Sequence, residues 1–314
     1  MSPYNLGRTL IIANPTAHSG RGEAAAIFAM RFFSSYVTTT SSCEVRLTES
    51  GGDAAQMAAD AQDYETVLAL GGDGVIHETV NGLMRIPEEL RPRLGVIPMG
   101  SGNDFARTLG MRINDPEAAI KQLFDGQRRR VDLGVVNGTY FMQTLSFGLD
   151  AAIALDTTDR RANSSAQSGS MLFVTSGFKL ILTALKGWPY RAEIDGEVME
   201  GIDIAFAVQN GPTYGGGFRI CPRAIPNDGV LDLCLTVDKP SLPHSLLLFG
   251  LARAGRHVRS KMLELRQVRH LEVSFGTGEQ PPCQVDGEPL QADRYVVDVV
   301  PQALEVVAAP TCGW

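Results

Sequence analysis

Short apolar runs alternate with helical patterns over the first third of the chain. The strand-like runs are TLIIAN (9–14), CEVRLT (43–48), TVLAL (66–70) and LGVIPMG (94–100). An alanine-rich stretch (23–33) follows the first run, and Ile76, Val80 and Leu83 fall at helical spacing after the third. Strands that alternate with helices predict a parallel, doubly wound sheet, and such sheets bind ligands at the carboxyl ends of their strands.

Beyond VDLGVV (131–136) the pattern changes to short alternating strands separated by turn signals. These strands are expected at TYFMQTL (139–145), YRAEID (190–195), DIAFAVQN (203–210), VLDLCLTV (230–237), LEVSF (271–275) and RYVVDVV (294–300). Two longer stretches without a strand pattern interrupt them, at 155–188 and 239–268. The pattern is typical of an antiparallel sandwich or barrel. The last run, ALEVVA (303–308), could belong to either part of the chain.

The composition is that of a globular protein long enough for two domains. Of 314 residues 44% are hydrophobic and 20% are charged, and the formal net charge of −7 argues against nucleic acid as a partner of the whole surface. The five cysteines are scattered and include no CxxC pair. We therefore expect reduced thiols in a cytosolic protein, with no disulfide framework and no zinc site.

We expect neither a signal peptide nor a membrane span. The N-terminus lacks a basic segment followed by a long apolar one. The most apolar segment, residues 171–188, is interrupted by Gly177, Lys179 and Lys186, so it is expected to pack in the fold or to line an apolar groove. We expect a cytoplasmic protein, with a peripheral contact to the inner face of the membrane left open.

Three glycine-rich turns follow strands of the expected parallel sheet. They are NPTAHSGRGE (14–23), GGDGVIHE (71–78) and PMGSGNDFAR (98–107). A single turn of this kind needs glycine for structural reasons alone, but three at consecutive strand ends favour a phosphate site built from backbone N–H groups. The P-loop motif is absent, and the first turn lacks the dinucleotide fingerprint. Asp73 and Asp104 would repel phosphate unless Mg²⁺ bridges the two or the carboxylates orient the loops, so the turns suggest a magnesium nucleotide.

The second and third turns carry motifs that resemble a known family. GGDGVIHETVNGL followed by PMGSGNDFAR resembles the diacylglycerol kinase catalytic domain and its soluble bacterial lipid kinase relatives, a domain that sphingosine and ceramide kinases share. NAD kinases share the GGDG loop, but GSGNDFAR and the YGGG and PNDG stretches favour the lipid branch. The likeness extends over nearly the whole chain, through NPTA, SFGLDA (146–151), NGPTYGGGFRICPRAIPNDGVLDL (210–233) and VDGEPL (285–290).

The resemblance implies a fold of the α/β plus all-β class. An N-terminal doubly wound, Rossmann-like domain over residues 1–133, to which 303–314 return, would bind the nucleotide. A C-terminal antiparallel β-sandwich over residues 134–302 would bind the lipid acceptor, with the active site in the crevice between the domains.

The resemblance also implies ATP and Mg²⁺ as cofactors. The nucleotide contacts carried over by motif are Asn14, Pro15, Thr16, Ala17, His18, Thr48, Gly72, Asp73, Gly74, Val75, Ile76, His77, Glu78 and Ser101. The magnesium site would be built around Asp228 with the backbone carbonyls of Ile225 and Val230. Asp73, Asp104 and Asp132 would join Asp228 in a water-linked network.

Two positions depart from the family's usual GGDGT-x-N-E pattern. Val75 replaces the threonine and cannot donate a hydroxyl to phosphate, and His77 replaces the asparagine with a larger group. These departures keep a second class of function open, a nucleotide- or lipid-binding regulator with weakened catalysis.

The tripeptide Asp-Gly-Glu occurs twice, at 195–197 and at 286–288. Asp-Gly between apolar runs is a strong hairpin signal, and a hairpin turn is the better account of the first copy. The second copy corresponds to the family's base position. By that resemblance Glu288 would accept the proton of the lipid hydroxyl, and Asp286 would orient it or the metal network. None of the five histidines matches a base position.

A lipid acceptor would need an apolar groove and access to a membrane surface. Residues 170–188 and 241–255 offer apolar side chains at roughly helical spacing, which core packing explains equally well. From Arg253 to Arg269 six basic residues meet only one acidic residue, Glu264, and this run could hold an anionic bilayer or simply form a solvated face.

The favoured function is an ATP- and Mg²⁺-dependent lipid kinase that phosphorylates a lipid hydroxyl at the membrane surface. Diacylglycerol is the default acceptor and phosphatidic acid the product. The alternatives are a kinase for a sphingoid base, ceramide or another lipid, and the regulator described above. The sequence leaves the oligomeric state open, a homodimer included.

Overall fold

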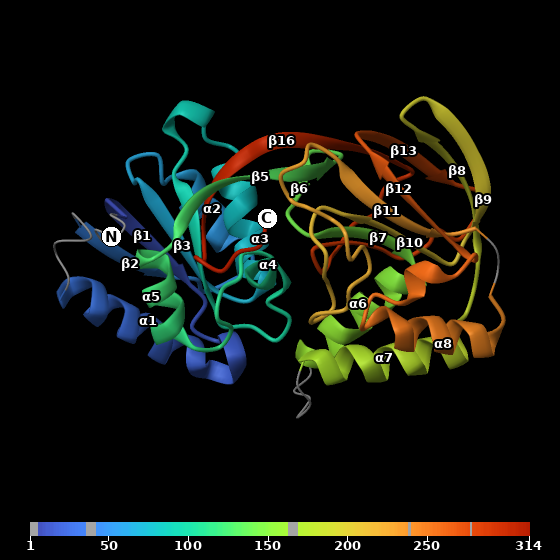
Figure 1. The fold of residues 1–314 in the computed structure, drawn as a ribbon. Coiled ribbons are helices and arrows are strands. Elements are labelled where there is room, and N and C mark those ends of the chain that lie inside the picture. Colours follow the sequence, from blue (N-terminus) through green and yellow to red (C-terminus); the bar gives the residue numbers. More distant parts are fainter. Residues whose placement is uncertain (1–5, 36–41, 163–168, 238–239, 277) are drawn as a thin grey trace. The chain divides into compact units, whose positions relative to one another are not determined.

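The computed structural model describes residues 6–35, 42–162, 169–237, 240–276 and 278–314. The chain forms two compact units, Met1–Val131 with Gln302–Trp314, and Asp132–Pro301 (Figure 1). Strands β5 (Gln127–Val136) and β16 (Arg294–Ala308) each contribute residues to both units.

The first unit is built on a parallel sheet in the order β2-β1-β3-β4, to which the end of β16 adds at Val306 beside Leu94. The four strands are β1 (Arg8–Ala13), β2 (Ser42–Leu47), β3 (Thr66–Gly71) and β4 (Arg93–Pro98). β3 and β4 are buried along their whole length, as expected of central strands with both faces covered, and this is why their sequences are continuous apolar runs.

Helices pack against this sheet in two pairs. Helices α1 and α5 contact each other and the sheet, and so do α2 and α3, which makes the sheet doubly wound as predicted (Figure 1). The helices are α1 (Ala17–Ser35), α2 (Asp53–Ala59), α3 (Asp73–Leu83), η1 (Glu88–Leu90), α4 (Asp104–Thr108) and α5 (Pro116–Phe124). The predicted spacing of α3 is confirmed, because Ile76, Val80 and Leu83 are all buried.

The second unit contains two antiparallel sheets that enclose one core. The first has the order β12-β11-β10-β7-β14-β15, and the second contains β16, β13, β8 and β9 in that order. Rings from both sheets meet between them, with Phe147 of β7 and Tyr295 of β16 edge to face at 4.8 Å. The predicted β-sandwich is therefore confirmed. The strands are β6 (Thr139–Phe141), β7 (Thr144–Gly148), β8 (Trp188–Ile194), β9 (Glu197–Asp203), β10 (Ala205–Gln209), β11 (Leu231–Thr236), β12 (Leu263–Val268), β13 (His270–Phe275), β14 (Cys283–Val285) and β15 (Glu288–Pro289).

Three helices form a second apolar layer of this unit (Figure 1). They are α6 (Leu149–Ala162), α7 (Gly169–Thr183) and α8 (Leu242–Ala252), followed by η2 (His257–Arg259). Phe173 of α7 and Phe249 of α8 pack around Phe218, with ring centroids 4.8 and 5.3 Å from it. Within the described ranges, no helix is both long and apolar enough to cross a membrane.

Two details of the expected strands differ from the structure. TYFMQTL forms two strands, because the backbone N–H groups of Met142 and Gln143 donate to the Asp286 carboxylate. The stretch 239–268, expected to lack strands, contains β12, which pairs with β11 at the edge of the first sheet. The part of 155–188 at 163–168 lies outside the described residues.

Candidate active site

The predicted nucleotide loops of the first unit all follow the carboxyl ends of neighbouring parallel strands. Backbone hydrogen bonds link the start of each loop to the end of a neighbouring strand: Asn14 N donates to Leu70 O at 3.0 Å, Thr48 N to Ala13 O at 2.9 Å, and Met99 N to Gly71 O at 2.7 Å. The loops that carry Asn14, Thr48, Gly72 and Ser101 therefore share one edge of the sheet. This is the edge at which doubly wound sheets bind ligands.

The first loop is a tight turn fixed by its own side chain. The Asn14 Oδ1 atom accepts hydrogen bonds from Thr16 N at 2.9 Å and Thr16 Oγ1 at 2.8 Å. Pro15 is half-buried and Thr16 exposed, α1 begins at Ala17, and His18 has a φ of 50°. The turn thus presents short polar groups, while α1 packs against the sheet and α5.

The second and third loops are in direct contact and are tied by Asp73. The Asp73 carboxylate accepts hydrogen bonds from the backbone of both Asn103 (2.7 Å) and Asp104 (2.9 Å). A Cβ atom at Gly100 would lie 2.5 Å from the Cα of Gly72, so only glycine allows this approach. Of the two roles considered for Asp73, orienting a loop is the one that these hydrogen bonds support. Gly74 and Ser101 are half-buried in the same two loops, and Asp104 is buried.

Three of the predicted nucleotide residues lie in α3, and their side chains are buried inside the unit. Val75, Ile76 and His77 are buried, and the Val75 side chain lies against Gly71. The Glu78 Oε2 atom accepts a hydrogen bond from Ala54 N at 3.2 Å, in the first turn of α2. Any contact of Val75, Ile76 or His77 with a phosphate would therefore come from the backbone N–H groups in the first turns of α3.

Acidic residues of the second unit gather beside the Pro-Asn-Asp-Gly turn. Asp132 is fully buried, and its Oδ2 accepts a hydrogen bond from Gly229 N at 2.7 Å. Partial desolvation raises the pKa of Asp228, and the charge of Asp132 raises it further. Burial and the charge of Asp228 raise the pKa of Asp232 to about 6. This region carries excess negative charge, which a cation would neutralise.

The predicted metal ligands offer oxygen atoms only. Asp228 Oδ1 accepts a hydrogen bond from Val230 N at 3.3 Å, and Ile225 O accepts one from Asn227 N at 2.9 Å, so all three residues belong to one turn. Carboxylate and carbonyl oxygens suit a hard cation such as Mg²⁺. Over the part of the chain that the structure describes, no group of three or more His, Cys, Asp or Glu side chains could hold a metal ion by itself.

The second Asp-Gly-Glu tripeptide is the turn between β14 and β15. The Asp286 carboxylate accepts hydrogen bonds from three consecutive backbone N–H groups, those of Met142, Gln143 and Thr144, at 2.9 to 3.0 Å. The Glu288 side chain is exposed at the start of β15. Of these two carboxylates, the Glu288 group is the one that is accessible to a substrate.

The first copy of the tripeptide forms the turn between β8 and β9, as the sequence indicates. Asp195 has the same φ as Asp286, 49°, and it likewise accepts backbone hydrogen bonds, here from Arg269 and His270. The Glu197 carboxylate, however, forms an ion pair with Arg266. The two turns share a backbone shape, but only the glutamate of the first turn, Glu197, forms an ion pair.

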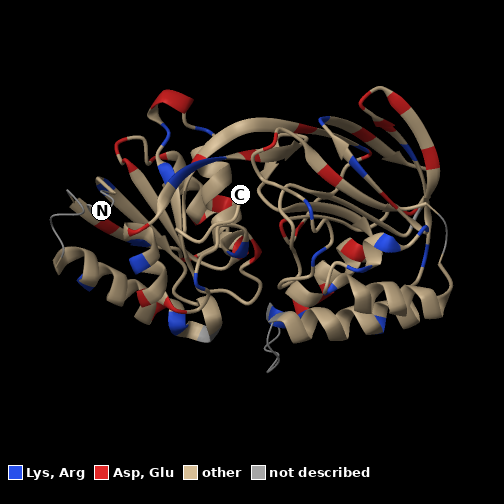
Figure 2. Cartoon of the chain, in the orientation of Figure 1, with Lys and Arg blue, Asp and Glu red and all other residues tan. Residues whose placement is uncertain are grey.

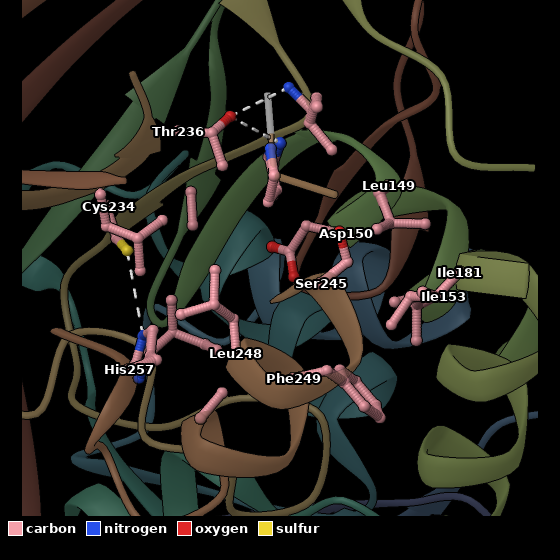
Figure 3. A pocket seen from close by; sticks show the side chains of 17 residues that line it. Leu149, Asp150, Ile153, Ile181, Cys234, Thr236, Ser245, Leu248, Phe249 and His257 are labelled. Atoms are coloured by element: carbon pink, nitrogen blue, oxygen red, sulfur yellow. Dashed lines mark hydrogen bonds between the residues drawn. The ribbon is translucent and has the colours of Figure 1, made fainter. Parts of the chain in front are cut away.

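An apolar pocket lies within the second unit between the sandwich and the helices α6, α7 and α8 (Figure 3). Its empty space, open mouth included, is about 670 Å³. Ile153, Ile181, Leu248 and Phe249 contribute much of its wall, so both segments that the sequence offered for an acyl groove reach it.

Asp150 lies on the wall of this pocket. Burial raises the pKa of its carboxyl from 3.8 to about 6, although hydrogen bonds from Tyr214 and Ser146 act in the opposite direction. Sequence reasoning did not single out Asp150 or Asp232. The motifs SFGLDA and VLDL contain them, but their unusual environment comes from segments distant in the sequence.

Both halves of the chain match known families. Residues 8–136 match the family model described as the diacylglycerol kinase catalytic domain, and residues 143–308 match the YegS C-terminal NAD kinase beta sandwich-like domain. A "Probable lipid kinase YegS-like" protein of Cronobacter sakazakii is 31% identical over 277 residues, which cover 86% of this chain and 87% of that protein. A diacylglycerol kinase of Bacillus subtilis is 30% identical over 287 residues, which cover 90% and 89% of the two chains.

A solved structure shows the same fold. The crystal structure of a diacylglycerol kinase from Bacillus anthracis superposes with a TM-score of 0.79 over 98% of each chain, at 22% identity. The two family matches and the nearly full-length relatives establish that the chain belongs to the diacylglycerol kinase-like family of lipid kinases.

Proposed function

We propose that this lipid kinase transfers the γ-phosphoryl group of ATP to the hydroxyl of diacylglycerol and releases phosphatidic acid. The observation that carries the proposal is the tie between the two glycine loops, in which Asp73 accepts hydrogen bonds from Asn103 N and Asp104 N. Such loops, at the ligand-binding edge of a doubly wound sheet, supply backbone donors for phosphate. The similarity to a protein named diacylglycerol kinase over 90% of the chain supports the choice of acceptor.

The ATP phosphates would be bound mainly by backbone N–H groups. Gly72 and Gly74 flank the start of α3, and Asn14 with Thr16 forms the neighbouring turn. The predicted contacts at Pro15, Ala17, His18, Thr48 and Ser101 lie on the same edge and stay predictions. Phosphoryl transfer depends largely on positioning and on neutralising charge, so a preformed cradle of amides is the main contribution of this unit.

Glu288 would accept the proton of the lipid hydroxyl. Its side chain is exposed, whereas the oxygen atoms of Asp286 already accept three backbone hydrogen bonds. Asp286 would therefore act as a positioning residue that fixes the hairpin bearing the base. The location of this hairpin beside the nucleotide, in a crevice between the domains, stays a prediction.

Asp228 and the carbonyl oxygens of Ile225 and Val230 would hold Mg²⁺. The raised pKa values of Asp228 and Asp232 fit this role, because a cation would relieve the repulsion between their negative charges. When bound, the ion supplies charge neutralisation for the transferred phosphoryl group. Asp73 and Asp104 of the first unit and Asp132 of the second would be linked to the site through water.

The apolar pocket of the second unit would take a hydrocarbon chain of the acceptor. Its wall combines aliphatic and aromatic side chains from α6, α7 and α8 with residues of the sandwich. Such a pocket binds chains through area removed from water and gives little selectivity for their length.

The outer surface of α7 and α8 would rest on the membrane. Figure 2 shows few charged residues on these two helices. Large apolar side chains are exposed there: Met171, Phe178, Leu182, Leu242 and Leu247. The basic run from Arg253 to Arg269 begins where α8 ends and continues over η2 and β12, so it does not form one helix face. Its exposed members would add attraction to anionic lipids at the inner face of the membrane of a cytoplasmic protein.

A lipid panel tests the proposal. The purified chain is incubated with radiolabelled ATP, Mg²⁺ and mixed micelles that contain diacylglycerol, a sphingoid base or ceramide. Transfer to diacylglycerol is expected to exceed transfer to the other acceptors. Preferred transfer to another lipid would identify that lipid, and not diacylglycerol, as the acceptor. ATP binding without transfer to any lipid would favour the alternative function, a nucleotide- or lipid-binding regulator with catalysis weakened by Val75 and His77.

A further inference from the structure

A buried glutamine lies beside the turn that carries Glu288. Gln284 of β14 is fully buried, and its side-chain Oε1 accepts a hydrogen bond from Gly287 N at 2.6 Å. Its Nε2 donates to the Ser146 hydroxyl at 2.8 Å. Gln284 and Ser146 lie opposite each other in the paired strands β14 and β7, so the amide joins the turn to the neighbouring strand of the same sheet.

The donors and acceptors of these hydrogen bonds have a fixed order. A backbone N–H group can only donate, so the amide oxygen of Gln284 faces Gly287 and the amide nitrogen faces Ser146. The Ser146 oxygen accepts from that nitrogen, and its own hydrogen is donated to the Asp150 carboxylate. Asp150 lies in the first turn of α6, on the wall of the apolar pocket (Figure 3). A directed chain of hydrogen bonds therefore connects the pocket wall to the turn.

The backbone of this hairpin holds the turn only weakly. β15 contains just Glu288 and Pro289 at the edge of its sheet, and proline has no N–H group to donate to β14. Gly287 has a φ of 96° and is not one of the paired residues of the two strands. The Gln284 side chain thus binds an N–H group that the strand pairing leaves out.

The other Asp-Gly-Glu turn forms without such a connection. Glu193 occupies the position equivalent to Gln284, two residues before Asp195. It is only half-buried, and among the described residues the Gly196 N–H group donates to no side chain. Formation of the hairpin therefore does not by itself require the hydrogen bonds that Gln284 makes.

We propose that Gln284 is a positioning residue for phosphoryl transfer, which fixes the turn that carries Glu288 relative to the wall of the apolar pocket. The inference rests on the proposed roles of Glu288 as the base and of the pocket as the site of a hydrocarbon chain of the acceptor. A base acts only within hydrogen-bond reach of the hydroxyl, and small displacements lower the rate steeply. Because the pocket and the turn belong to the same unit, the link between them determines where the base meets the acceptor.

A double-mutant cycle tests the positioning role. Gln284→Met keeps the length of the side chain and removes both hydrogen bonds. With the preferred acceptor of the lipid panel in micelles, it is expected to lower kcat about 10- to 100-fold and to leave the KM for ATP within about twofold. In a Glu288→Gln background the same exchange should change the rate by less than about twofold, because the residue that Gln284 positions no longer accepts a proton. A merely structural role would lower the rate equally in both backgrounds.

Hydrogen exchange tests the link without ATP or lipid. Exchange of the Gly287 amide is followed by mass spectrometry with residue-level fragmentation, and Gln284→Met is expected to accelerate it at least about tenfold. Ser146→Ala should also accelerate it, to a smaller extent, because the Gln284 amide loses the acceptor that holds its nitrogen. This milder variant serves as the test if Gln284→Met does not fold.

Gln267→Met is the matched control, since Gln267 is exposed on the edge strand β12 of the same sheet. It should leave both the rate and the exchange unchanged. Equal losses of rate in the two backgrounds, or unchanged Gly287 exchange in a variant that is folded by near-UV circular dichroism, would overturn the inference while the kinase activity stands. Absence of transfer to any lipid would instead overturn the proposed function, and the positioning role with it.

Discussion

Two identical Asp-Gly-Glu tripeptides in hairpin turns differ in what their glutamates contact. Glu197 pairs with Arg266, whereas no side-chain hydrogen bond or ion pair to Glu288 occurs among the described residues. The pair offers an internal comparison, since the same substitution can be made in the same local backbone.

Glu288→Gln is expected to lower the rate of phosphoryl transfer about 10²- to 10⁴-fold, because the amide cannot accept a proton. ATP affinity, measured by equilibrium titration, should change little. Glu197→Gln serves as the control and should keep nearly full activity. Full activity in Glu288→Gln would show that another group takes the proton.

Asp286 is expected to matter for stability as well as activity. Asp286→Ala leaves three backbone N–H groups without their acceptor, so the free energy of unfolding should fall by about 1–3 kcal/mol or more in urea titrations. Asp195→Ala removes a similar set of hydrogen bonds from an exposed turn and should cost less. Equal losses in the two variants would contradict the anchoring role of Asp286.

Asp150 gives a pH dependence whose sign follows from its raised pKa. The folded protein holds the proton up to about pH 6, whereas the unfolded chain releases it near pH 3.8. Stability should therefore fall as pH rises through this window, by at most about 1.4 kcal/mol per pH unit from this group. Asp150→Asn removes this contribution, so the stability of the variant relative to the wild type should rise between pH 4 and pH 6.5. A flat difference curve in urea titrations would show that the pKa of Asp150 is not raised.

At the scale of elements, the contact between the loops after β3 and β4 is the feature most sensitive to small changes. Gly100→Ala would bring a methyl group against the backbone of Gly72, and the loops would have to separate. We expect at least a tenfold loss of ATP affinity, with unfolding free energy reduced by about 1–3 kcal/mol.

Gly250→Ala is the matched control for this substitution. Gly250 lies in α8, has no atom within 4 Å of an added Cβ and has no strained φ. The exchange should leave ATP affinity unchanged and stabilise the helix by about 0.5–1 kcal/mol. An unchanged ATP affinity in Gly100→Ala would mean that the loop contact does not shape the nucleotide site.

The elements also show how far the sequence alone could be interpreted. β1, β3 and β4 were predictable because strands buried on both faces have continuous apolar runs. The break between β6 and β7 was not, because it depends on Asp286, which lies 142 residues beyond Thr144 in the chain. β12 was missed because it is an edge strand, and its mixed burial blurs the alternation of apolar and polar residues.

The sequence likewise revealed only part of the candidate site. The glycine loops were found because close backbone approach requires glycine, a constraint that the sequence displays directly. Asp150 and Asp232 were not found, because a raised pKa comes from burial by segments far apart in the chain. The roles of the individual residues in binding ATP, lipid and metal stay predictions.

For the whole molecule, the proposed membrane contact predicts that substitutions on α7 and α8 weaken binding to vesicles without a matching loss of catalytic activity. Leu182 and Leu247 are 58% and 57% exposed on α7 and α8. Replacing both with serine should weaken binding to anionic vesicles about tenfold or more, because less apolar surface enters the interface. Activity on diacylglycerol dispersed in detergent micelles should change much less.

Leu90→Ser is the control, since Leu90 is 54% exposed on η1 in the first unit. This variant should sediment with vesicles as the wild type does. Equal loss of vesicle binding in both variants, or in neither, would exclude α7 and α8 as the membrane contact.

The two units differ in how their residues are ordered along the chain, and this affects their folding during synthesis. The second unit is a continuous segment, whereas the first needs Gln302–Trp314 in addition to its first 131 residues. That segment supplies Ala303 O, which accepts a hydrogen bond from Arg91, and Trp314, whose ring nitrogen donates to Thr108 O at 2.7 Å. On the ribosome, the first unit therefore has to wait, with its parallel sheet one strand short, until the second unit has been made.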